Sequence, residues 1–168
     1  DVTLTSTTGA IVQTGTVAAA ALTNYTAETT TGALTLGALT VGVTASNPLK
    51  TVSYTSTTGT VTTADITAST GTAVTAMTSY TIVSGVNTSA NTYGALDLGA
   101  DGTLGTYSIT AGASTAANNY GVITAADVGA VNVTTGNGGG SHTLATMATV
   151  LALGDITIDA DDDVTITT

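Results

Sequence analysis

The sequence predicts an all-β fold, and three observations lead to that prediction. Aliphatic and hydroxyl residues alternate over short runs, about one residue in four is threonine, and Gly, Asn or Asp interrupts the runs every several residues. Alternation with a period of two places the aliphatic side chains on one face of a strand and the hydroxyls on the other. Because the chain has 168 residues, we expect one all-β domain over 1–168, or one repeat of a longer fibrous protein.

The strands follow one another closely along the chain. The clearest alternating runs are Val2–Thr5, Leu34–Leu36, Leu39–Val41, Ile156–Ile158 and Val164–Thr167. Turn residues separate the runs at Thr8-Gly9, Gly32, Gly37, Asn47-Pro48, Thr58-Gly59, Gly71, Asp101-Gly102, Asn118-Asn119 and Asn137–Gly140. The spacing of these turn residues predicts about fourteen short strands.

In two segments a short helix is an alternative to a strand. Thr124–Asp127 resembles a capping box, and Leu144, Met147 and Leu151 are spaced for one helical face that Gly154 would end. The alternative is that alanine-rich strands imitate helical periodicity.

The composition restricts both the core and the partners. Six Tyr are the only aromatic residues and Cys is absent, so we expect a thin core of small, closely stacked side chains without disulfides. One basic residue against eleven acidic ones gives a net charge of −10. That charge argues against nucleic acid and against anionic membrane surfaces, because no basic patch can neutralise phosphates. No apolar stretch approaches the about 20 residues of a membrane-spanning helix, so we expect no membrane insertion.

Two similarities within the chain suggest a repeat. Val2–Gly9 (VTLTSTTG) is similar to Val52–Gly59 (VSYTSTTG), and Asp163–Thr168 (DVTITT) is similar to Asp1–Ser6 (DVTLTS). Self-similarity of this kind is typical of solenoid architectures. The second similarity predicts that another copy, or another repeat, continues the pattern at the terminal strands. The residues expected to carry this assembly are Asp1, Val2, Leu4, Val164 and Ile166.

A family resemblance rests on the two ends of the chain. Gly154–Ala160 (GDITIDA), followed by Asp163–Thr167, has the form of a repeated coil phrase; Asp1–Gln13 is a second such phrase and Asp65–Ala68 a weaker third. In these phrases the chain resembles the filamentous haemagglutinin-like large secreted β-helix exoproteins, and Thr-rich prokaryotic surface-fibre and surface-layer (S-layer) proteins use similar ones. The resemblance implies a right-handed parallel β-helix, a β-solenoid, with a surface or adhesive role.

The chain departs from that family in its uneven coil lengths and its few Asn positions for an interior ladder. An antiparallel β-sandwich, jelly-roll-like and completed by a neighbour's strand, therefore remains the alternative fold. For a solenoid with roughly twenty residues per coil and strands about 4.8 Å apart, we expect an advance of about 40 Å per chain.

The acidic cluster near the end of the chain is the candidate metal site. Asp155, Asp159, Asp161 and Asp163 share one parity, so on a continuing strand they would project from one face. Carboxylates and carbonyls are the ligands of Ca²⁺. The alternative is a solvated outer face followed by an Asp-rich turn, without any cofactor.

The remaining polar residues give weaker signals. His142 follows a glycine tract and lacks a carboxylate nearby in sequence, which favours a loop histidine over a catalytic base. Lys50 is interpreted as a surface lysine. Glycosylation sequons occur at Asn24, Asn87 and Asn132.

These observations together indicate an extracellular structural protein of a prokaryotic cell surface. The expected function is that of a subunit or repeat of a filament or surface layer, self-assembling end to end through uncapped terminal strands. The alternative is an adhesin module that binds a glycan or a cell surface. An enzyme is not expected, because solenoid lyases and glycosidases need paired carboxylates with basic or aromatic residues lining a groove, and this chain has almost no basic residues.

Overall fold

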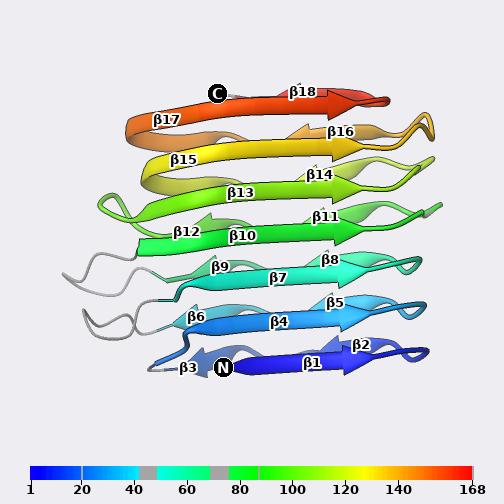
Figure 1. The fold of residues 1–168 in the computed structure, drawn as a ribbon. Coiled ribbons are helices and arrows are strands. Elements are labelled where there is room, and N and C mark those ends of the chain that lie inside the picture. The colour runs from blue at the N-terminus through cyan, green and yellow to red at the C-terminus, as the bar shows by residue number, and fades with distance from the viewer. Residues whose placement is uncertain (20, 42–48, 69–75, 87, 168) are drawn as a thin grey trace.

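The computed structural model describes residues 1–19, 21–41, 49–68, 76–86 and 88–167. In these residues the chain forms a parallel β-solenoid of about six turns. Figure 1 shows the coils stacked one above another, with the two termini at opposite ends of the stack. Every strand pair in the described residues is parallel. The β-solenoid prediction is confirmed and the antiparallel sandwich is excluded; the right-handed sense stays a prediction.

Each coil passes through three faces. Face 1 holds the long strands β1 (Val2–Ser6), β4 (Asn24–Thr29), β7 (Thr51–Ser56), β10 (Ala76–Ser84), β13 (Thr103–Ala111), β15 (Ile123–Thr135) and β17 (Met147–Ala160). Face 2 holds β2 (Ile11–Gln13), β5 (Leu34–Leu36), β8 (Val61–Thr63), β11 (Asn91–Tyr93), β14 (Asn118–Tyr120), β16 (Ser141–Leu144) and β18 (Asp163–Ile166). Face 3 holds β3 (Val17–Ala19), β6 (Leu39–Val41), β9 (Ile66–Thr67), β12 (Leu96–Asp97) and the first residues of β15 and β17, which bend through it into face 1.

Residues in the same position of successive coils form columns, and these columns define the repeat. One inward-facing column of face 1 consists of Val2, Tyr25, Val52, Tyr80, Tyr107, Val131 and Ile156. Its members are 23 to 28 positions apart in the chain. The coils are therefore uneven, as expected, but longer than the roughly twenty residues predicted.

The corner between faces 1 and 2 explains the first sequence similarity. The phrases Ser6–Gly9, Thr29–Gly32 and Ser56–Gly59 occupy this corner in three successive coils. In each of them the first hydroxyl oxygen accepts a hydrogen bond, 3.1 Å long, from the backbone N–H of the glycine. The similarity of Val2–Gly9 to Val52–Gly59 is thus positional, two coils apart, and the middle copy at Thr29–Gly32 was not recognised in the sequence.

The second sequence similarity is not positional. Val2–Ser6 is β1 on face 1, whereas Asp163–Ile166 is β18 on face 2. The residues that occupy the columns of Val2 and Leu4 in the last coil are Ile156 and Ile158 of β17. The resemblance between the two ends therefore reflects a common strand pattern, not a common place in the coil.

The alanine-rich segments that left a helix open are strands. Thr124–Asp127 lies within β15, Leu144 ends β16, and both Met147 and Leu151 lie in β17. Pairing of β15 with β13 and β17 outweighs the local helical periodicity of these residues.

The core is a narrow column between the three faces. All six tyrosines are buried in it. On face 1, Tyr25, Tyr54, Tyr80 and Tyr107 form a run with ring centroids 5.3–6.2 Å apart, and Tyr93 stacks on Tyr120 at 4.9 Å on face 2. Tyr80 and Tyr107, and likewise Tyr93 and Tyr120, are register partners and stack, whereas Tyr54 lies in the neighbouring column and meets Tyr25 and Tyr80 edge to face.

Candidate functional site

The two outermost coils present unpaired strand edges. At one end β1, β2 and β3 pair only with β4, β5 and β6, and at the other β17 and β18 pair only with β15 and β16. Figure 1 shows these edges as the lowest and highest coils of the stack. Along such an edge, backbone N–H and C=O groups remain free to bind another strand. Within the described residues, no segment covers either edge.

The core is also open at these edges. Ile156 and Ile158 of β17 are 42% and 47% exposed, although they occupy inward-facing positions. Val52, in the same column as Ile156 but inside the stack, is fully buried. At the other end, Val2 and Leu4 are only partly buried. Each end therefore exposes aliphatic side chains that one more coil would cover.

The predicted assembly residues all lie at these edges. Val2 and Leu4 face inward on β1, while Val164 and Ile166 face inward on β18, and all four are partly buried against the core. Asp1 is exposed, and its carboxylate accepts a hydrogen bond of 2.8 Å from the Nδ2 amide of Asn24.

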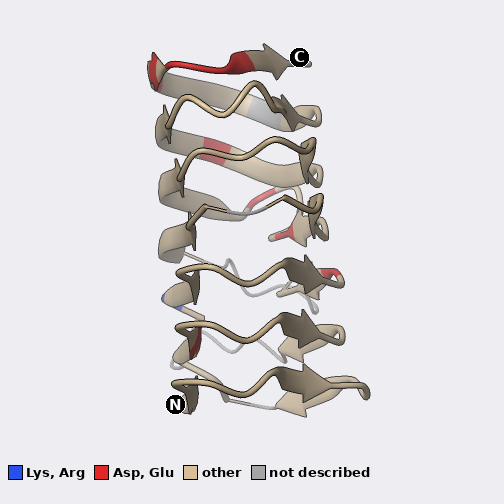
Figure 2. Cartoon of the chain, turned by 90° about the vertical axis from the view of Figure 1, so that its right-hand side faces the viewer, with Lys and Arg blue, Asp and Glu red and all other residues tan. Residues whose placement is uncertain are grey.

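The acidic residues do not share one face, because the chain turns within the cluster. Asp155 and Asp159 lie on β17 of face 1, β17 ends at Ala160, and Asp163 begins β18 on face 2. Asp161 lies in the corner between these strands. Figure 2 shows the acidic colour concentrated on the coil at the C-terminal end. Among the described residues, no group of three or more His, Cys, Asp or Glu is placed to hold a metal ion.

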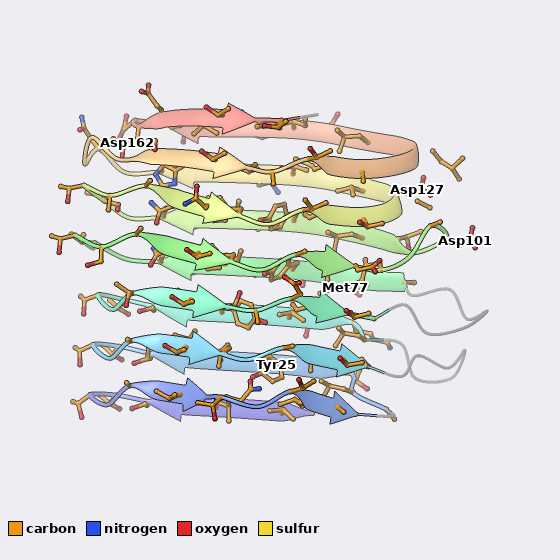
Figure 3. All side chains as sticks on the ribbon, turned by 180° about the vertical axis from the view of Figure 1, so that it is seen from behind. Tyr25, Met77, Asp101, Asp127 and Asp162 are labelled. Carbon is orange, nitrogen blue, oxygen red and sulfur yellow. The ribbon has the colours of Figure 1, made fainter. Side chains whose placement is uncertain are left out.

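Asp162, next to the predicted ligands Asp161 and Asp163, has a defined structural role in the last coil. Its carboxylate accepts hydrogen bonds from the backbone N–H groups of Gly138, at 3.0 Å, and Gly139, at 2.7 Å. These bonds hold the pKa of Asp162 below its usual range. Figure 3 shows Asp162 at the corner of the last coil. The carboxylate thus joins this corner to the corner of the preceding coil.

His142 is a core residue, so the prediction of a loop histidine is wrong. It lies on β16, is fully buried, and its Nδ1 is 3.2 Å from the hydroxyl of Tyr120. Its Nε2 is 3.9 Å from a carboxylate oxygen of Asp162, too far for a hydrogen bond. Burial lowers the pKa of His142, and the attraction of Asp162 opposes this shift without reversing it. The alternation of Ser141–Leu144, which gives His142 the parity of the apolar Leu144, is the signal that indicates its inward orientation.

A short interior column of polar residues contains this histidine. Asn91, Asn118 and His142 occupy one inward-facing column of face 2 in three successive coils, and all are fully buried. The Oδ1 of Asn91 accepts a hydrogen bond of 2.7 Å from the backbone N–H of Val61 in the coil before. The Nδ2 of Asn118 donates to the backbone carbonyl of Ala116. The chain therefore has one interior column in which three successive coils place a polar side chain, two of them Asn.

The outer surface of face 1 carries a column of uncharged polar residues. It consists of Thr3, Thr26, Ser53, Thr81, Ser108, Asn132 and Thr157, one from each coil. All seven are at least partly exposed. The alternation predicted from the sequence is thus extended across the stack into a row of six hydroxyls and one amide.

The glycosylation candidates fall at different places. Asn132 belongs to this outer column, and Asn24 also lies on face 1, partly exposed. The Oδ1 of Asn24 accepts a hydrogen bond from the hydroxyl of Thr51 at 2.7 Å. Asn87 lies outside the described residues. Lys50 is exposed, as predicted, and makes no ion pair with any described residue.

No helix long and apolar enough to cross a membrane occurs in the described part of the chain. Comparison of the sequence with protein-family models and with curated proteins, and comparison with solved structures, gives no match. The structural conclusion is therefore the fold, a parallel β-solenoid of about six turns.

Proposed function

We propose that the chain is a structural subunit or repeat of an extracellular filament or surface layer on a prokaryotic cell. In this proposal it assembles end to end, through its uncapped terminal strands, with copies of itself or with adjacent repeats. The observation that carries the proposal is the pair of open ends, where free strand edges coincide with exposed inward-facing aliphatic side chains.

Physical chemistry supports assembly over a solitary state. A solenoid whose terminal coils lack a polar cover tends to stack or to be insoluble. One more coil would bury the halves of Ile156 and Ile158 that water now contacts, and burial of apolar surface contributes roughly 25 cal/mol per Å². The same contact would pair the free N–H and C=O groups of both edges.

The test compares two lysine substitutions in one strand. Ile158→Lys places a charge in the proposed contact, whereas Thr157→Lys adds the same charge to the outer surface. Negative-stain microscopy and sedimentation of the purified chain should show ordered fibres for the intact protein and for Thr157→Lys, and monomers for Ile158→Lys. Intact protein that sediments as a monodisperse monomer at high concentration would refute the proposal.

The outer polar column of face 1 supports a second candidate function, an adhesin module that binds a glycan. Hydroxyl and amide groups at regular spacing offer hydrogen-bond donors and acceptors to sugar hydroxyls. If this function is right, the monomeric Ile158→Lys protein should be retained on a glycan array, and replacement of Ser53, Thr81 and Ser108 by Ala should abolish retention. We propose no catalytic role, because Ser141 and His142 point to opposite sides of β16.

A further inference from the structure

The two end edges of the solenoid are complementary to each other, residue by residue. On face 1, Val2 and Leu4 occupy the columns of Ile156 and Ile158. On face 2, Ile11 occupies the column of Val164. On face 3, Val17 occupies the column of Met147, although this face has one strand fewer than the other two. At each of these positions both ends present an inward-facing apolar side chain.

We infer that the partner at each end is a second copy of this chain, docked head to tail in the register of the solenoid. In this arrangement β1 of one copy lies beside β17 of the other, and β2 lies beside β18. Faces 1 and 2 then continue from one copy to the next with parallel strands, whereas face 3, which has one strand fewer in each copy, leaves one strand position open at the junction. The inference rests on the proposed end-to-end assembly and specifies its geometry.

Strand direction favours this arrangement over contact between two like ends. Two copies related by a two-fold axis across their β17 edges would meet with antiparallel strands. Their faces would also follow one another in opposite order, so the three columns could not match together. The head-to-tail contact instead repeats the parallel pairing that every described strand already makes.

Charge favours the same arrangement. The β17–β18 end carries five carboxylates, at Asp155, Asp159, Asp161, Asp162 and Asp163, whereas the coil that begins with β1 carries one, at Asp1, before β4. Contact between two β17–β18 ends would oppose acidic side chains, and like charges directly across strands are destabilising. In the head-to-tail register Asp159 lies beside Thr5 and Asp163 beside Ala10, so only Asp155 meets another carboxylate.

A head-to-tail contact of this kind does not close on itself. A heterologous interface that leaves its own surfaces free at both ends generates an open polymer. The copy contributes seven strands to face 1, so the repeat along the polymer should be about 34 Å at about 4.8 Å per strand. This value replaces the estimate of about 40 Å, because the real coils are longer than twenty residues and therefore fewer.

Cysteine cross-linking tests the register directly, because the natural chain has no Cys. Thr3 and Thr157 share an outward-facing column, so across the junction their Cα atoms should be about 5 Å apart. We expect a short bismaleimide to join Thr3→Cys protein to Thr157→Cys protein as a covalent heterodimer. The double variant should form a ladder of covalent oligomers. Circular dichroism should confirm that each variant keeps the β fold.

Two controls separate the register from the function. Val12 is exposed on face 2, so a mixture of Val12→Cys and Thr157→Cys proteins should not cross-link. Dimers formed by Thr157→Cys protein alone would indicate contact between like ends. Either of those results, in protein that still forms fibres, would overturn the head-to-tail register and leave the proposed function standing. Absence of any fibres from the intact chain would overturn both.

Discussion

The corner between faces 1 and 2 leaves no room for a side chain at Gly59. An added Cβ would lie 2.0 Å from the carbonyl oxygen of Gly32 in the coil before, and an added Cβ at Gly32 would lie 2.1 Å from that of Gly9. The hydroxyl of Ser56 fixes the corner, since it accepts from the N–H of Gly59 and donates to its carbonyl at 2.8 Å. We therefore predict that Gly59→Ala destabilises the protein.

The expected loss of stability depends on how far the added Cβ and the carbonyl oxygen must move apart. A Cβ needs about 3.0 Å from a carbonyl oxygen, so the two coils must separate by about 1 Å at this corner, within the range of overpacking that costs about 1–3 kcal/mol. The obstructing atom is backbone in a hydrogen-bonded ladder, where Thr57 and Thr58 donate to the coil before at 3.1 and 3.0 Å. It cannot rotate away as a side chain can. We expect the upper part of that range, about 2–3 kcal/mol, which lowers Tm by about 4–12 °C in a chain of this size.

Thermal unfolding followed by circular dichroism measures this effect. Gly15→Ala is the matched control, because a Cβ at Gly15 meets no atom within 4 Å. It should be neutral, or stabilising by up to about 1 kcal/mol through the unfolded chain. Gly32→Ala should behave like Gly59→Ala. If Gly59→Ala and Gly15→Ala melt at the same temperature, the stacked-glycine account of the corner is wrong.

Three further predictions concern the last coil and the one basic residue. Asp162→Ala should lower Tm by several degrees, because it removes the acceptor of the Gly138–Gly139 amides, whereas Asp161→Ala, an exposed neighbour, should not. Stability should fall as the pH drops below about 6.5, the usual pKa of histidine, because the folded-state pKa of His142 is lowered and folding therefore opposes its protonation. Stability should fall again in the pH range where carboxylates titrate, because the folded-state pKa of Asp162 is also lowered. When Tm is measured over a series of pH values, His142→Gln should remove only the first of these two declines. Trypsin should cut native protein slowly and give two fragments by mass spectrometry, since Lys50 is the one target and its backbone N–H and carbonyl are hydrogen-bonded to adjacent coils. Rapid native cleavage would contradict this.

Local alternation predicted the orientation of the clearest strands, although it gave about fourteen strands where the described residues form eighteen. In Leu34–Leu36 and Leu39–Val41 the leucines and Val41 are buried and the threonines lie on the outside, as the period-two pattern requires. The same pattern placed Val2 with Leu4, and Val164 with Ile166, on one face of their strands, and in the structure that face points inward. These predictions succeeded because side-chain direction in a strand depends only on sequence parity.

The assumption that residues of the same sequence parity share one face failed where the chain turns. Across the acidic segment it placed Asp155 and Asp163 on one face, but the corner after Ala160 moves Asp163 to face 2 and directs Asp162 toward His142. The contact between Asp162 and His142 joins two different coils, and no local pattern specifies it. The hydroxyl corner at Thr29–Gly32 was missed for a different reason, because Glu28 stands where the other two copies have Thr5 and Thr55, so the phrase before the corner is less similar.

The uneven length of the coils has a physical explanation in where the extra residues lie. From face 2 to face 3 the step is short and nearly constant: β5 ends at Leu36 and β6 begins at Leu39, and β14 ends at Tyr120 with the next strand beginning at Ile123. From face 3 to face 1 it varies, since β6 ends at Val41 and β7 begins only at Thr51, whereas β15 runs through without a break. The core requires each column to stay in register, because a slip of one residue would turn every apolar side chain outward. A connection between strands carries no such requirement, and extra length there costs little entropy. The repeat of this protein is therefore regular in its columns but irregular in its residue spacing. A search for a fixed period along the sequence cannot find it.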